Sequence, residues 1–135
     1  MKRSQKAMAA ASAGLLLLSG PAWSEACCDP ASPFILGEAF PEIPATCATV
    51  GDWVDRAPQI DARISFTIVG PVAEVHFDGA LAYLIMCEAT GVQVMCVTYS
   101  TNDLEPGDVV MLAGGYSRIG EKQVMLDPCL PYDAP

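Results

Sequence analysis

The chain has 135 residues, of which 52% are apolar and 17% charged, and it contains six cysteines. This length fits one domain of ordinary size once a leader segment is removed. Sixteen acidic residues against seven basic ones give a formal net charge of −9, which argues against a surface built to bind phosphate backbones or anionic lipids.

Residues 1–24 have the order of a secretory signal peptide. Three basic residues lie within the first six positions, the apolar run 7–18 follows, and Ala22 and Ser24 place small residues where signal peptidase reads them. The run is too short to span a bilayer as a mature helix. We predict cleavage after Ser24, with cleavage after Ala26 as the alternative, and a periplasmic or secreted protein. Cleavage after Ser24 leaves four bases against sixteen acids, a formal net charge of −12.

Residues 25–60 are predicted to form an irregular arm and one short helix. Four prolines lie in 25–45, and proline removes backbone donors and blocks helix formation. Apolar residues in 46–57 recur at spacings of three and four, which predicts a short helix that ends before Pro58. These residues are Cys47, Val50, Val54 and Ala57.

From residue 61 the apolar pattern changes to period two, which predicts strands. The first strand covers 63–77 and bends at Gly70-Pro71. The others are expected at 82–88, 92–99, 108–113 and 123–126, with Gly114-Gly115 as a break and the regular structure ending at 127–129. Five short strands with glycine at the bends favour a closed barrel over 61–130, followed by a tail at 131–135.

This barrel region resembles the OB-fold superfamily. The residues that carry the resemblance are the bent strand ISFTIVGPVAEV, the hairpin end CEATGVQVMCVTY, and EPGDVVMLAGGY, whose Gly107-Asp108-x-Val110 and Gly114 match the entry to the fourth OB strand. The resemblance covers roughly residues 61–128 and is closest in style to secreted bacterial OB-fold proteins of the stress-associated type. It implies an all-β protein with a small five-stranded OB-fold-like barrel, an N-terminal arm and a short helix.

An even number of cysteines in an exported chain indicates a disulfide framework. Cys87 and Cys96 are placed symmetrically about the turn at Thr90-Gly91, so we predict a cross-strand disulfide between them. Cys129 is then expected to tether the end of the last strand to the N-terminal segment, with Cys47 as its partner. Six cysteines allow fifteen pairings, so the second assignment depends on the first.

The residues expected to face a ligand are three tyrosines and one arginine: Tyr83, Tyr99, Tyr116 and Arg118. OB-folds often bind oligonucleotides through a basic groove with stacking aromatics, but this chain has no clustered bases. His76, the single histidine, has no partners that would make a catalytic or metal site. No catalytic residue, metal or cofactor is predicted.

The sequence therefore predicts a non-enzymatic, secreted or periplasmic OB-fold module that binds a protein, peptide or small ligand in the cell envelope. One alternative is nucleic-acid or oligosaccharide binding by the barrel face. Another is soft-metal or redox handling by the hairpin that carries Cys87 and Cys96, because Met86 and Met95 lie beside these thiols and soft sulfur ligands select Cu(I).

Overall fold

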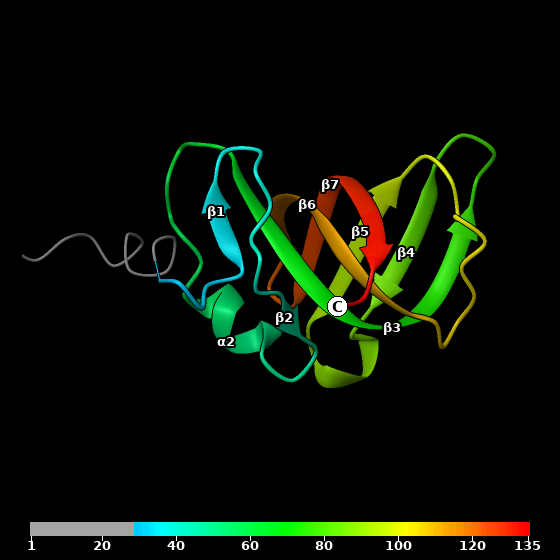
Figure 1. Cartoon of the computed structure of the whole chain (residues 1–135), viewed down its shortest axis with the longest axis horizontal. Helices are drawn as coiled ribbons and strands as arrows, with labels where there is room; N and C mark the ends of the chain where they lie inside the picture. Colours follow the sequence, from blue (N-terminus) through cyan, green and yellow to red (C-terminus); the bar gives the residue numbers. More distant parts are fainter. Residues whose placement is uncertain (1–28) are drawn as a thin grey trace, which may run out of the picture.

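The computed structural model describes residues 29–135 (Figure 1). The predicted signal peptide, both cleavage positions and the first residues of the arm lie in 1–28, outside the described residues, and stay predictions. None of the helices in the described part of the chain is long and apolar enough to cross a membrane.

Five strands form a closed barrel. They are listed in chain order: β3 (Ile64–Phe77), β4 (Ala82–Met86), β5 (Gln93–Thr98), β6 (Val109–Gly120) and β7 (Gln123–Asp133). Their spatial order is β3-β4-β5-β7-β6, and β6 pairs back onto β3 to close the sheet. Neighbouring strands run antiparallel except for β5 and β7, which are parallel. The predicted five-stranded OB-fold-like barrel is confirmed.

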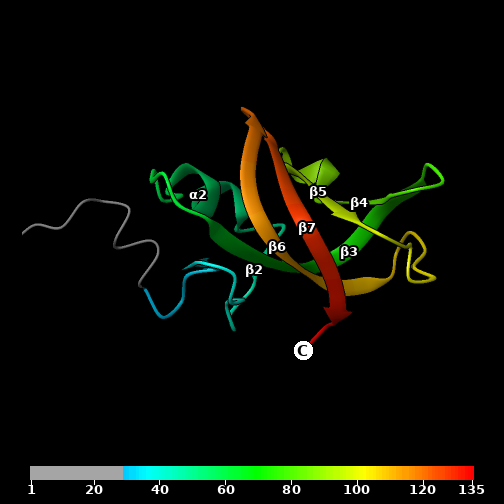
Figure 2. The same cartoon turned by 90° about the horizontal axis from the view of Figure 1, so that it is seen from above.

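The arm contains more regular structure than its prolines indicated. β1 (Phe34–Leu36) pairs antiparallel with β3, and β2 (Ala45–Thr46) pairs parallel with it. The predicted helix is present as α2 (Val50–Asp55), and a short 3₁₀ turn, η1 (Glu88–Thr90), follows β4. Figures 1 and 2 show β1 and α2 together at one end of the barrel, with the β3–β4 turn at the other end.

Strands β6 and β7 run further than predicted. β6 continues through Gly114-Gly115, and β7 continues past 127–129 to Asp133. Gly114 pairs with Cys129, and a Cβ atom on Gly114 would lie 2.9 Å from the Cα atom of Cys129. Glycine at this position therefore allows two backbones to approach closely, and it does not interrupt the strand.

The core lies inside the barrel and beneath the arm. The side chains that are exposed least include Phe66 and Ile68 from β3, Leu84 from β4, Leu112 from β6 and Leu126 from β7. Phe34 of β1 is also buried, and its ring centroid lies 4.9 Å from that of Phe66. Burial of this aromatic ring explains why the arm is held against the barrel.

The predicted disulfide pairing is wrong, although all four predicted cysteines are in disulfides. The bonds join Cys47 to Cys87 and Cys96 to Cys129. In the β4–β5 hairpin Leu84 lies opposite Cys96, so Cys87 falls beyond the last paired residue of β4. Cys87 there adopts a left-handed backbone conformation, with φ of 65°, and bonds to the residue that follows β2.

These bonds also bear on the soft-metal alternative. Both hairpin cysteines are consumed in disulfides, so neither offers a thiolate to a metal in this state. Met86 is fully buried in the core, whereas Met95 is only partly buried. The soft-metal reading of the hairpin is therefore contradicted for the oxidised protein. Two disulfides are compatible with an oxidising compartment.

Candidate functional site

A cleft of about 450 Å³ opens between the loop 58–63 with the first residue of β3 on one side and strand β6 on the other. Its apolar lining comes from Pro58, Ile60, Ala62, Ile64 and the ring of Tyr116, and its polar lining from Gln59, Asp61, Ser117 and Arg118. We call this depression the Tyr116 cleft. It brings together two segments that are more than fifty residues apart in the sequence.

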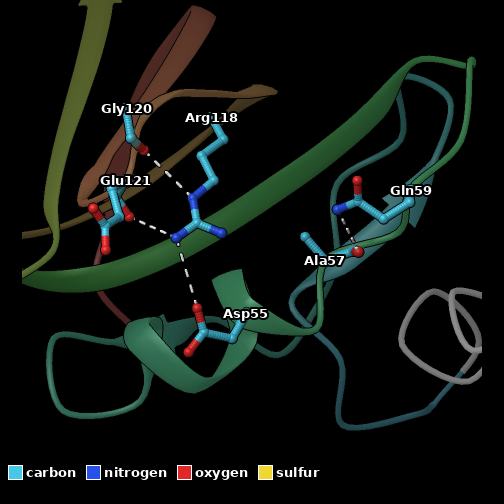
Figure 3. Close-up of polar contacts among 6 residues, drawn as sticks. All are labelled: Asp55, Ala57, Gln59, Arg118, Gly120 and Glu121. Carbon is cyan, nitrogen blue, oxygen red and sulfur yellow. Dashed lines mark hydrogen bonds and ion pairs between the residues drawn. The ribbon is translucent and has the colours of Figure 1, made fainter.

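The loop side of the cleft is fixed by the end of α2. The backbone N–H groups of Arg56 and Ala57 donate to the carbonyls of Trp53 and Val54 at 3.1 and 3.2 Å, which ends the helix. Pro58 then prevents its continuation. The side-chain amide of Gln59 donates to the carbonyl of Ala57 at 3.3 Å, as Figure 3 shows. The loop therefore leaves the helix along a defined path before it enters β3.

Tyr116 forms the inner wall of the cleft. Its ring centroid lies 5.0 Å from that of Phe34, edge to face, and 5.7 Å from that of Phe66. Its hydroxyl oxygen is buried and has no hydrogen-bond partner among residues 29–135. Burial raises the pKa of Tyr116, the charge of Arg118 lowers it, and the charge of Asp55 raises it. The phenol is therefore neutral near pH 7, and it offers one donor and one acceptor.

Arg118 forms part of the rim and is held by three oxygen atoms. Its guanidinium donates to the carbonyls of Gly120 and Glu121, and one terminal nitrogen lies 3.6 Å from a carboxylate oxygen of Asp55 (Figure 3). These contacts join the β6–β7 turn to α2 and fix the guanidinium beside the cleft. Because the Arg118 side chain is still 38% exposed, part of the group faces solvent.

The other two predicted ligand-face residues lie elsewhere. Tyr83 donates to a carboxylate oxygen of Asp78 at 2.9 Å in the β3–β4 turn. Backbone N–H groups of Leu81 and Ala80, and then the Tyr83 hydroxyl, lower the pKa of Asp78. Tyr99 follows β5 and is 72% exposed. The structure therefore brings Tyr116 and Arg118 together but does not unite all four residues on one face.

Sequence reasoning missed Gln59, Ile60, Asp61 and Ser117 as cleft residues. Pro58 indicated that a loop follows the helix, but no signal in that loop identifies the strand that it faces. The contact arises because β6 pairs with β3, with Ser65 opposite Gly115, and this closure places Tyr116 beside the residues that precede β3.

Comparison with known proteins identifies no family. No protein-family model matches the chain, and no curated protein matches it. Among solved structures, a chain of the Stn1–Ten1 complex of S. pombe matches with a TM-score of 0.39 and 18% sequence identity, over 54% of this chain and 60% of that chain. The matched region is less than two thirds of that chain, and a likeness of this size says nothing about function.

Proposed function

We propose that this protein is a non-enzymatic OB-fold binding module, secreted or periplasmic and similar in kind to the stress-associated bacterial type. Its Tyr116 cleft takes an apolar side chain of a peptide or envelope protein, or a small ligand of similar size. The observation that carries this proposal is an apolar cleft walled by Tyr116, beside an arginine that is held in position.

The dimensions and chemistry of the cleft support a compact ligand. Its volume of about 450 Å³ falls in the range of roughly 300–1,000 Å³ that is usual for small-molecule sites. Ile60, Ile64 and the Tyr116 ring supply apolar contact, whereas Gln59 and Arg118 supply directional hydrogen bonds.

The charges of the cleft lining suit the binding of a neutral ligand. Asp61 and Arg118 place one negative and one positive side chain along the cleft, so neither a polyanion nor a polycation is favoured. Residues 29–135 contain no cluster of three or more His, Cys, Asp or Glu side chains that could hold a metal ion. These features support our proposal of a binding module.

Three arginines already contact side chains of this protein, which supports a protein or peptide partner over nucleic acid. The Arg56 guanidinium lies 4.2 Å from the ring centroid of Trp53, and Arg63 lies 3.5 Å from a carboxylate oxygen of Glu38. Arg118 is paired with Asp55. Binding to phosphates would require these contacts to be exchanged on a surface that is strongly acidic overall.

The proposal is tested by titrating the ¹⁵N-labelled oxidised protein with N-acetyl-leucinamide and N-acetyl-phenylalaninamide, two uncharged side-chain probes. We expect saturable amide shifts at Ile60, Ala62 and Ser117 at millimolar probe concentrations. Ile60→Asp places a charge in the apolar lining and should abolish these shifts, whereas Ile119→Asp, on an exposed residue of β6 that does not line the cleft, should leave them unchanged. Shifts centred on Tyr83 and Tyr99, or no shifts at all, would overturn the proposal.

A further inference from the structure

The two disulfides lie in different environments. Cys96 and Cys129 are 0% and 2% exposed, so the bond between them is sealed inside the barrel. Cys87 is 5% exposed, but its partner Cys47 is only partly buried. Thiol–disulfide exchange requires a thiolate to reach a sulfur atom, so solvent access favours the Cys47–Cys87 bond as the site of exchange.

A second cleft, of about 230 Å³, lies directly against this bond, and both cysteines line it. We call it the disulfide cleft. Its walls come from Pro71, Val72 and Ala73 of β3 and from Glu88, Ala89 and Thr90 of η1. These side chains are small or apolar apart from Glu88 and Thr90, so the space fits a low-molecular-weight thiol and not a folded protein.

Carboxylates give the disulfide cleft its charge. Glu88 lines it, and Glu74 shares a hydrogen bond with Glu88, which raises the pKa of Glu88. Glu74 also bonds to the His76 ring at 2.9 Å. Acidic groups at this position repel an incoming thiolate that carries further negative charge, and they favour one that carries an amino group.

We propose that Cys47–Cys87 is a thiol-exchange site for small aminothiols. The thiolate forms a bond to Sγ of Cys47, the more exposed of the two residues, and the Cys47–Cys87 bond breaks. Cys87 leaves with the electron pair and takes a proton from water, while Cys47 is left as a mixed disulfide with the aminothiol. A second aminothiol thiolate then attacks the aminothiol sulfur of that mixed disulfide. Cys47 leaves with the electron pair and takes a proton from water, and the aminothiol is released as its disulfide.

The barrel should stay folded when the Cys47–Cys87 bond opens. Cys47 follows β2, which pairs with β3 through only two residues, Ala45 and Thr46. The Cys96–Cys129 bond meanwhile joins β5 to β7 within the closed sheet. The mixed disulfide therefore forms on a folded protein, in which the tie between the arm and η1 is lost and the barrel closure is kept.

The test compares cysteamine with 2-mercaptoethanesulfonate, two small thiols of opposite side-group charge. The native oxidised protein is treated with each, alkylated rapidly with N-ethylmaleimide, and mapped by peptide mass spectrometry, with rates referred to thiolate concentration. We expect the added thiol to be found as a mixed disulfide on Cys47, the N-ethylmaleimide group on Cys87, and the Cys96–Cys129 bond intact. Cysteamine should react roughly 30-fold faster, because the two thiols differ by two unit charges and each unit charge at about 4 Å in water changes the rate about fivefold.

Two variants separate the cleft charge from general surface charge. Glu88→Gln should bring the reaction rates of the two thiols closer together. Glu121→Gln, on the exposed β6–β7 turn, should leave the ratio of these rates unchanged. Circular dichroism confirms that each variant is folded. The proposal fails if Cys96–Cys129 is reduced first or if the mixed disulfide forms on Cys87. It also fails if both thiols react at equal rates, or if the rate ratio is unchanged in Glu88→Gln.

Discussion

Replacing Tyr116 with phenylalanine should stabilise this protein. The Tyr116 hydroxyl is buried and without a hydrogen-bond partner among the described residues, and a buried polar group in that state costs about 1–3 kcal/mol. Phenylalanine removes the hydroxyl and keeps the ring contacts with Phe34 and Phe66. Because the loss of one oxygen leaves only a small void, we expect a net gain of about 1–2 kcal/mol in the free energy of unfolding.

Urea denaturation of the oxidised protein, followed by the fluorescence of Trp53, measures this change. Tyr83→Phe is the matched control, because its hydroxyl donates to Asp78 at 2.9 Å, and the loss of this bond should not raise stability. If Tyr116→Phe is instead less stable than the parent, the hydroxyl has a partner in solution and the reasoning about its burial fails.

Four further predictions concern other parts of the chain. Gly114→Ala should lower stability by about 1–3 kcal/mol in the same urea assay, because the new Cβ meets backbone that cannot move aside. Its control is Gly51→Ala in α2, whose Cβ would lie 3.8 Å from its nearest neighbour; this change should raise stability by about 0.5 kcal/mol. The pKa of Asp78 is lowered in the folded state, so its contribution is present above the ordinary pKa of about 3.9 and is lost as the pH falls below it; Asp78→Asn should flatten that part of an acid titration of stability. Fluorescence anisotropy should detect no binding to single-stranded DNA tighter than about 10⁻⁶ M at physiological salt. N-terminal sequencing of the exported protein should begin at Glu25, and a chain that begins at Met1 would contradict the signal peptide.

The sequence predicted the barrel because its signals are local. The alternation of apolar and polar residues in β3 and the bend at Gly70 are properties of one strand, and they indicated a long bent strand correctly. Gly114 was read as a break because the sequence does not show what lies opposite a glycine. In the structure the backbone at Cys129 lies there, and β6 continues.

The disulfides and the cleft depended on information that lies between strands. Cys87 and Cys96 can bond across the hairpin only if they lie opposite each other. The structure instead places Leu84, three residues before Cys87, opposite Cys96. The Tyr116 cleft depends on the closure of β6 onto β3 and on the path of the loop that begins at Pro58. A single sequence fixes neither of these arrangements.

The far half of β7 has a consequence for how this protein meets other molecules. β5 pairs with β7 only as far as Leu126, and the pairings of the described residues leave the following part of β7 with β6 as its one neighbour. An open strand edge normally invites an added strand from another chain. Pro128 and Pro131 supply no N–H donors here, while Leu130 and Tyr132 are 48% and 38% exposed. The two prolines therefore interrupt the row of backbone donors that an added strand would need, and the exposed side chains of this segment are left as its main contact surface.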